Sequence, residues 1–145
     1  MNIRPMTVED KESVIEMMRT FYASEAVLTN GSEEIFRNDV EACVSDNSYL
    51  EGFILEEQGV IAGYAMLAKS FSTEFGEPCI WIEDLYLKEP YRGRGLGGQL
   101  LRFIQEKYPH CLHRLEVEEE NTRAVRAYEK CGFSVLPYVE MVHNT

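Results

Sequence analysis

Hydrophobic residues in the first third of the chain recur with the period of an α-helix. The apolar positions Val14, Ile15, Met18, Phe21 and Tyr22 define one helical face, and Thr7 is placed to cap this helix after a short strand at Asn2–Arg4. The break Asn30-Gly31-Ser32 separates it from a second predicted helix. The buried face of the second helix is expected to hold Ile35, Phe36, Val40, Cys43 and Val44.

The middle of the chain has the apolar runs and turn residues of β-strands. Tyr49–Leu55 and Val60–Ala68 flank a turn at Glu56-Glu57-Gln58-Gly59, which predicts a hairpin. A third long strand, Cys79–Leu87, follows the turn Gly76-Glu77-Pro78. These three strands are therefore expected to form the centre of a mostly antiparallel sheet.

The last third of the chain alternates helical and strand patterns. It predicts a helix over Gly95–Tyr108, a strand over Leu112–Glu118, a helix that begins at Asn121, and a last strand over Tyr138–Val142. The element order β-α-α-β-β-β-α-β-α-β implies an α/β fold, with a mixed sheet and helices on both faces. At 145 residues without a linker, residues 1–145 are expected to form a single domain.

Composition and charge narrow the function classes. The net charge of −11 argues against a nucleic-acid partner, and it suits either simple solubility or a cationic substrate. No apolar run reaches the roughly 20 residues of a membrane span, and the N-terminus lacks the apolar segment of a signal peptide. The four cysteines form no C-x-x-C pair and the three histidines lack metal-ligand spacing, so we expect no metal site and a cytoplasmic location.

The segment Tyr91–Gly98 carries the strongest chemical signal. It holds four glycines and two arginines between an apolar strand and an amphipathic helix. Glycine lets a ligand approach backbone N–H groups, and a helix N-terminus adds free donors, so this segment predicts a phosphate site. Its match to the dinucleotide pattern G-x-G-x-x-G is weak evidence, because five residues separate it from the strand and too little chain remains for a second nucleotide-binding half.

Two motifs together resemble a known family. The pattern Arg92-x-x-Gly95-x-Gly97 is similar to the acyl-CoA-binding loop of the GNAT-type N-acetyltransferase superfamily. A second stretch, Asn121-x-x-Ala124-x-x-x-Tyr128 followed by Gly132-Phe133, resembles that superfamily's downstream signature. The two motifs stand in the family's order with a strand between them, and the element order matches over nearly the whole chain.

The resemblance implies where acetyl-CoA binds. The backbone N–H groups of Gly93, Arg94, Gly95, Leu96, Gly97 and Gly98 would hold the pyrophosphate, and Arg92 would add positive charge. The strand end Leu85-Tyr86-Leu87 would hydrogen-bond the pantetheine arm, with the N–H near Leu85 polarising the thioester carbonyl. On the last helix, Asn121, Ala124 and Tyr128 would contact the cofactor, although Asn121 is also expected as a helix cap.

The resemblance also implies an acid and a base. Tyr128 would protonate the departing CoA thiolate, and Glu83 matches the position of a glutamate that accepts the amine proton in many members, directly or through water. Strict alternation along the strand puts Glu83 and Asp84 on opposite faces and places Glu83 with Trp81 and Leu85. Asp84 is then expected to pair with Arg94, Arg114 or a backbone group.

The acceptor is less well defined. The run Phe71–Gly76 followed by Ile82–Tyr86 is similar to diamine and polyamine acetyltransferases, which implies direct acetyl transfer to a small cationic amine in a ternary complex. Tyr22, Glu25 and Phe71 are candidate pocket residues from their order along the chain, and Glu116–Glu120 is either a solvated acidic face or a rim that attracts cations. A protein or peptide acetyltransferase and a non-catalytic acyl-CoA-binding module are the alternatives. A homodimer is expected from the family alone.

Overall fold

The computed structural model describes residues 1–27 and 31–144. It contains β1 (Asn2–Pro5), a 3-10 turn η1 (Val8–Asp10), α1 (Lys11–Tyr22), α2 (Glu33–Val44), β2 (Leu50–Glu57), β3 (Val60–Ser72), β4 (Glu77–Leu87), a second 3-10 turn η2 (Glu89–Tyr91), α3 (Leu96–Lys107), β5 (Leu112–Leu115) and α4 (Thr122–Lys130). The predicted order of elements is confirmed up to α4. Asn30 of the predicted break between the first two helices lies outside the described residues.

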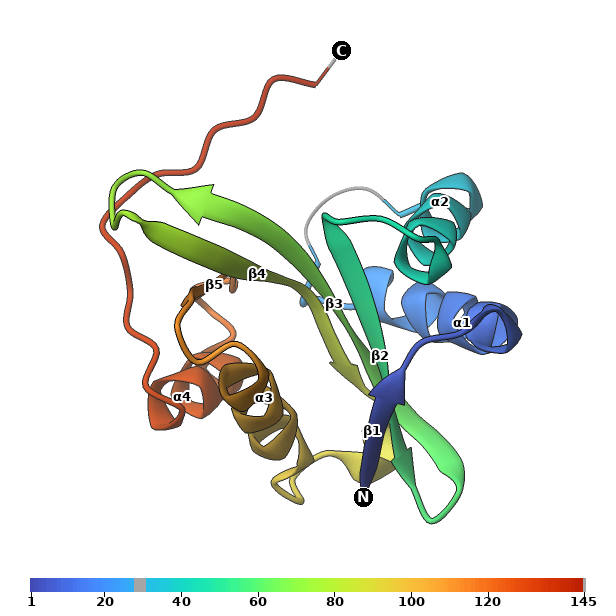
Figure 1. The fold of residues 1–145 in the computed structure, drawn as a ribbon. Coiled ribbons are helices and arrows are strands. Elements are labelled where there is room, and N and C mark those ends of the chain that lie inside the picture. Colours follow the sequence, from blue (N-terminus) through green and yellow to red (C-terminus); the bar gives the residue numbers. More distant parts are fainter. Residues whose placement is uncertain (28–30, 145) are drawn as a thin grey trace.

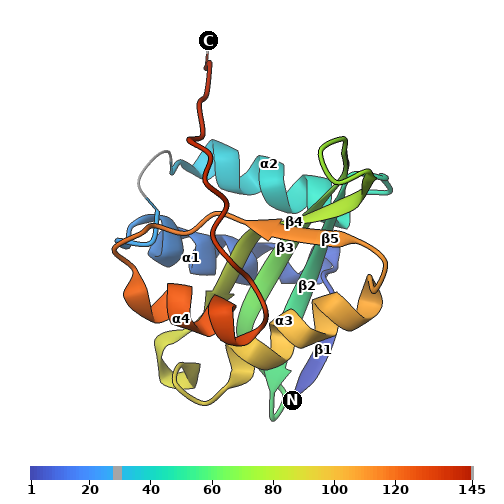
Figure 2. The ribbon, with the colours of Figure 1, turned by 90° about the vertical axis from the view of Figure 1, so that its left-hand side faces the viewer.

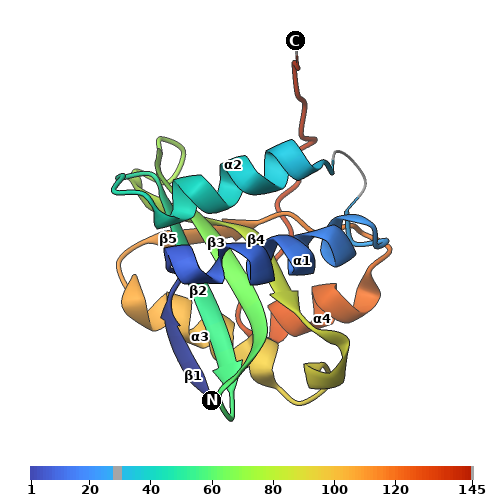
Figure 3. The ribbon, with the colours of Figure 1, turned by 90° about the vertical axis from the view of Figure 1, so that its right-hand side faces the viewer.

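One five-stranded sheet forms the middle layer, with its strands in the order β1-β2-β3-β4-β5. Neighbouring strands are antiparallel except for β4 and β5, which run parallel. Helices α1 and α2 cover one face, and α3 and α4 cover the other (Figures 1, 2 and 3). The predicted mixed, mostly antiparallel sheet between two helical layers is therefore confirmed.

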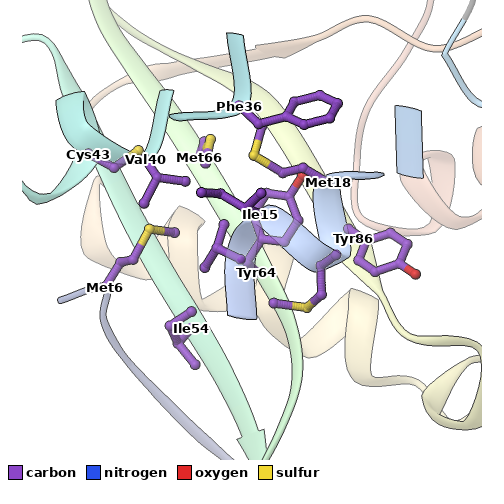
Figure 4. Close-up of a cluster of buried hydrophobic side chains, with 12 residues drawn as sticks. Met6, Ile15, Met18, Phe36, Val40, Cys43, Ile54, Tyr64, Met66 and Tyr86 are labelled. Carbon is purple, nitrogen blue, oxygen red and sulfur yellow. The ribbon is translucent and has the colours of Figure 1, made fainter. Parts of the chain in front are cut away.

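Each helical layer encloses its own core. The first core lies between α1, α2 and the sheet and includes the fully buried Ile15, Met18, Val40, Ile54 and Tyr64 (Figure 4). The second core lies between α3, α4 and the sheet. Its fully buried members include Ala65, Leu67, Leu100 and Ile104, and Tyr128 packs against them from α4. Because both sheet faces are covered, the central strands are apolar on both sides.

The C-terminal prediction was wrong in two respects. Residues 138–142, predicted as a strand, belong to an extended segment that has left the sheet, and Val139 and Met141 are each 90% exposed. The strand predicted over Leu112–Glu118 ends at Leu115. Both differences have one physical basis. A strand needs backbone partners, and the chain beyond Leu115 diverges from β4 before such partners form.

Candidate active site

A gap opens between β4 and β5. The two parallel strands pair from Cys79 and Leu112 as far as Ile82 and Leu115, where the ladder stops. Strand β4 continues for five more residues to Leu87, whereas the chain after Leu115 leads away toward α4. The edge of β4 that faces β5 is consequently open along its last five residues.

The hydrogen bonds of the neighbouring strand determine which backbone groups face this gap. Lys88 donates its N–H to the carbonyl of Ala62 on the β3 side at 2.8 Å. Because backbone direction alternates along an antiparallel strand, Tyr86 and Asp84 also face β3, and Leu85 and Leu87 face the gap. Of the predicted strand-end residues, the structure thus places Leu85 and Leu87 on the open edge and turns the backbone of Tyr86 away from it.

Glu83 is the extra residue of a β-bulge at the start of the gap. Met66 pairs with Asp84 and Leu67 pairs with Ile82, so Glu83 has no partner on β3. The bulge shifts the alternation by one residue: Ile82 lies in the second core before it, and Leu85 lies there after it. The predicted common face of Trp81, Glu83 and Leu85 is therefore wrong, because the bulge interrupts strict alternation. Bulges of this kind re-aim side chains beside active sites.

Asp84 is buried and accepts two phenol hydrogen bonds. It is 6% exposed, and its carboxylate accepts from the Tyr22 hydroxyl at 2.9 Å and from the Tyr64 hydroxyl at 2.7 Å. The expected arginine partners are engaged elsewhere: Arg94 pairs with Glu57 at 3.6 Å, and Arg114 stacks over Trp81. Tyr64 could not be linked to Asp84 from the sequence, because their contact depends on the register of β3 and β4.

Four carboxylates with raised pKa values lie near one another here, and for the fourth, Glu116, burial and a hydrogen bond with Glu140 raise the pKa to about 7. Partial burial raises the pKa of Asp39 to about 6, with the charges of Asp84 and Glu83 adding to the effect. Glu83 is solvent-accessible, yet the protein atoms around it remove part of its hydration and raise its pKa, and the charges of Asp84 and Glu140 add to this. Burial also raises the pKa of Asp84 against the opposing effect of its two tyrosine hydrogen bonds. Asp39, on α2, was missed by sequence reasoning because nothing in its local pattern points toward β4.

The glycine-rich loop presents a continuous row of free donors. Gly93 and Gly95 adopt left-handed backbone conformations, with φ of +76° and +78°. In the described part of the chain, none of the N–H groups from Gly93 to Gly98 donates to a protein acceptor, and the first intrahelical bond of α3 runs from Gln99 to Gly95. Six consecutive free N–H groups at a helix N-terminus form an anion-binding concavity. These six residues are the ones predicted for the pyrophosphate.

Two arginines beside this loop differ in their contacts. Arg92 turns back to the strand, where it donates to the Leu87 carbonyl at 2.9 Å and lies over the Tyr86 ring. Arg123, in the first turn of α4, approaches the loop so closely that its guanidinium lies 3.2 Å from where a Cβ on Gly93 would stand. Sequence reasoning missed Arg123, because its proximity arises from the packing of two helix N-termini that are far apart in the chain.

Helix α4 carries the second motif and packs beside α3. The side chain of Asn121 caps the helix by accepting from the Ala124 N–H at 3.3 Å, which confirms the capping prediction. Tyr128 packs in the second core with its ring against Phe133, and burial raises the pKa of its hydroxyl. No hydrogen bond to this hydroxyl is present among the described residues, so it is available to a ligand.

An acidic hollow of about 580 Å³ lies between the end of α1 and the start of α4. Glu25 lines it from one side, and Glu118, Glu120, Asn121 and Arg123 line it from the other. The structure therefore brings the candidate Glu25 to the predicted acidic cluster. It does not bring Phe71 to Glu83: Phe71 pairs with Pro78, and five residues of strand span about 16 Å.

Comparison with known proteins identifies the family. The model of the acetyltransferase (GNAT) family matches residues 13–133. The chain belongs to the acetyltransferase (GNAT) family. It is thus an acyl-CoA-dependent N-acetyltransferase, as both motifs predicted.

Two relatives of this GNAT chain have names that specify an amine acceptor. Spermine/spermidine N(1)-acetyltransferase of Bacillus subtilis is 24% identical over 139 residues, covering 91% of this chain and 86% of the relative. Thialysine N-epsilon-acetyltransferase of Bos taurus is 35% identical over 92 residues, covering 61% of this chain and 54% of the relative. The chain thus spans about half of the second relative and most of the first.

Solved structures share the fold over nearly the whole length. The aminoglycoside N-acetyltransferase AAC(6′)-Iy, in complex with CoA, superimposes with a TM-score of 0.80 at 19% identity, covering 99% of this chain and 93% of that one. A ribosomal-protein-alanine N-acetyltransferase from Brucella melitensis gives 0.77 at 13% identity, covering 99% and 98%. Within the described residues, no helix is long and apolar enough to cross a membrane. No group of three or more acidic, histidine or cysteine side chains there is arranged around a metal position.

Proposed function

We propose that this GNAT enzyme transfers the acetyl group of acetyl-CoA to a primary amine of a small cationic molecule. One observation carries the proposal: the open edge of β4 leads toward the row of free N–H groups at Gly93–Gly98, and a group of carboxylates that includes Asp39, Glu83 and Asp84 lies at the start of that edge. An anionic ligand with a long amide-containing arm fits the open edge and the free N–H groups. A cationic ligand fits the carboxylates.

The donor site is assigned to the loop and the open edge. The pyrophosphate of acetyl-CoA would accept hydrogen bonds from the N–H groups of Gly93–Gly98, with Arg123 beside them. The pantetheine amides would pair with Leu85 and with the N–H of Leu87, as an added strand does, because the Leu87 carbonyl is already bonded to Arg92. Asn121 and Ala124, at the start of α4, would border the same arm.

The chemistry is assigned to Glu83, Leu85 and Tyr128. Glu83, aimed by the bulge, would accept a proton from the ammonium group, directly or through water, so that the free amine can attack the thioester carbonyl in a ternary complex. The Leu85 N–H would stabilise the oxygen that becomes negative. As the new C–N bond forms and the C–S bond breaks, Tyr128 would give its proton to the thiolate. No covalent enzyme intermediate is needed.

The acceptor class follows from charge. Asp39, Glu83 and Asp84 lie on the acceptor side, and Glu25, Glu118 and Glu120 surround the hollow between α1 and α4. A negative rim raises the local concentration of cations. The Bacillus subtilis relative is named for spermine and spermidine, so polyamines are the first acceptors to test. Tyr22 and Glu25 would be the pocket residues. The expected homodimer and a cytoplasmic location also remain proposals. The location rests on four free cysteines, which suit a reducing compartment.

Two measurements test the proposal. A saturating concentration of acetyl-CoA should raise the melting temperature, since 100 times Kd adds about 2.7 kcal/mol to stability. Release of free CoA thiol should then be followed with polyamines, diamines, aminoglycosides, amino acids and peptides. Turnover confined to peptides would favour the protein acetyltransferase alternative. Binding without turnover of any amine would favour a non-catalytic module, and the absence of a thermal shift would remove the donor assignment.

A further inference from the structure

The last eleven described residues, 134–144, form an extended segment that we call the tail. It follows α4, crosses in front of the chain at the end of β5 and then leads outward (Figure 2). Its apolar side chains pack little against the domain, since Val139 and Met141 are each 90% exposed. A segment that buries so little surface opens at low cost, so polar contacts decide whether the tail stays in place.

Two side-chain hydrogen bonds join the tail to the folded domain. The Tyr138 hydroxyl donates to the Glu74 carboxylate at the tip of the β3–β4 hairpin. Two residues further on, Glu140 is hydrogen-bonded to Glu116, the first residue after β5. This second contact joins two acidic side chains, and an ionised carboxylate can only accept a hydrogen bond. One of the two carboxyl groups must therefore carry a proton.

The groups that face this pair are also acidic. Glu83, at the bulge of β4, acts on Glu116 with its charge, and Glu83 in turn is affected by Asp84 and Glu140. No lysine or arginine in the described part of the chain forms a salt bridge with these acids, and Arg114 of β5 stacks on the β4 indole instead. Partial loss of hydration and these acidic neighbours together raise the pKa of Glu116 to about 7.

We propose that the tail is a pH-dependent strap across the end of β5. The Glu116–Glu140 pair holds it in place while the two carboxyl groups share one proton, and repulsion releases it when both are ionised. The docked tail also brings the charge of Glu140 near Glu83. The consequence for catalysis rests on the proposed function: a docked tail favours protonated Glu83, and its release lets Glu83 accept the amine proton.

The direction of the switch follows from the number of bound protons. The docked state binds more protons than the released state between the ordinary glutamate pKa of 4.5 and the docked value of about 7. Docking is therefore strongest below this interval, weakens as pH rises through it, and has lost the contribution of the proton above it. Both glutamates are exposed, so solvent screens the pair. We expect the ratio of docked to released chains to fall about 10-fold between about pH 5 and about pH 8.

Backbone ¹⁵N relaxation of residues 138–142 measures docking in the full chain without any substrate. In the unmodified chain, order parameters should fall from about 0.8 at the acid end to below about 0.6 at the basic end. Glu140→Gln can donate to ionised Glu116 without a shared proton, so the tail should stay ordered throughout. Glu140→Ala should leave the tail mobile throughout. Glu119→Gln, which neutralises an exposed glutamate in the same acidic run, is the matched control and should retain the transition.

Three results would overturn the strap: order that does not change with pH in the unmodified chain, a transition that Glu140→Ala leaves intact, or a tail that Glu140→Gln releases. The link to catalysis has its own measurement. Glu140→Ala should raise the ratio of kcat at about pH 6 to kcat at about pH 8, because Glu83 loses a nearby negative charge and stays ionised to lower pH. An unchanged ratio would refute the effect on Glu83. Absence of amine turnover would count against the proposed function alone, since the relaxation data still decide the strap.

Discussion

Gly95 and Gly59 offer a matched pair of substitutions for the donor site. Both have φ of +78°, and a Cβ added at either position would meet no atom within 4 Å. Replacement by alanine therefore causes no clash at either site, and only the backbone preference changes. An L-residue in the left-handed region costs about 1–2 kcal/mol.

The structure around each glycine determines whether this free energy is lost from folding stability or from acetyl-CoA binding. Gly59 lies in a tight hairpin turn fixed by the pairing of Glu57 with Val60, so Gly59→Ala should lower the free energy of unfolding by about 1–2 kcal/mol. The N–H groups around Gly95 have no protein partners, and the loop is free to relax from positive φ. Acetyl-CoA must restore the original loop, so Gly95→Ala should weaken its binding about 5–30-fold, with a smaller loss of stability.

Calorimetric titration with acetyl-CoA and urea unfolding measure the two quantities on both variants. Gly59→Ala should bind acetyl-CoA with the affinity of the unmodified chain. An affinity of Gly95→Ala within twofold of that value would refute the assignment of the loop to phosphate binding. Equal losses of affinity in both variants would show instead that general destabilisation, and not the loop, is responsible.

Four further substitutions test individual groups. Tyr128→Phe keeps the ring and removes the hydroxyl, so thiol release should fall about 100-fold or more with unchanged acetyl-CoA affinity; a rate within threefold would contradict the acid role. The raised pKa of Glu83 should set the acid limb of the pH–rate profile, with activity lost as pH falls through it, and Glu83→Gln should lower kcat by a similar factor and remove that limb. Because the folded-state pKa of Asp84 is raised, its protonated form favours folding, and stability should decline as pH rises through that pKa. Urea unfolding of Asp84→Asn should show a smaller decline, and equal slopes would count against this burial effect. Arg123→Gln should weaken acetyl-CoA binding by about 10-fold or more in low salt, whereas Arg126→Gln, one turn further along α4, should not; titrations on both variants decide this.

Local sequence patterns were enough for the helices, the central strands and the backbone geometry of the glycine-rich loop. The six residues predicted for the pyrophosphate carry free N–H groups because glycine geometry and a helix start are both local properties. Asn121 was likewise predictable as a cap from its place before a helical pattern. Such features depend on a few neighbouring residues, and the chain encodes them directly.

Features that depend on distant pairing could not be read in the same way. The bulge at Glu83 exists because β3 and β4 pair with one residue of offset, so no local pattern records it. The contacts of Asp84 with Tyr64 and of Arg123 with Gly93 arise from the same kind of long-range packing. The last strand was predicted from composition alone. Residues 138–142 do have strand character, but strand formation also requires a paired neighbour, and these residues make no backbone hydrogen bond to a strand of the sheet.

Charged side chains of opposite sign lie at the two ends of the open edge of β4. The chain carries a net charge of −11, yet four arginines, Arg92, Arg94, Arg102 and Arg123, lie at the glycine loop, where an anionic donor would bind. The raised-pKa carboxylates lie at the other end of the open edge, beside the bulge. Opposite fields at the two ends of one strand segment would orient an anionic donor and a cationic acceptor toward the same point. The bulge leaves Glu83 without a partner on β3, whereas its neighbour Asp84 stays buried with two tyrosines, so two adjacent carboxylates have different surroundings and only the accessible one, Glu83, is proposed as the base.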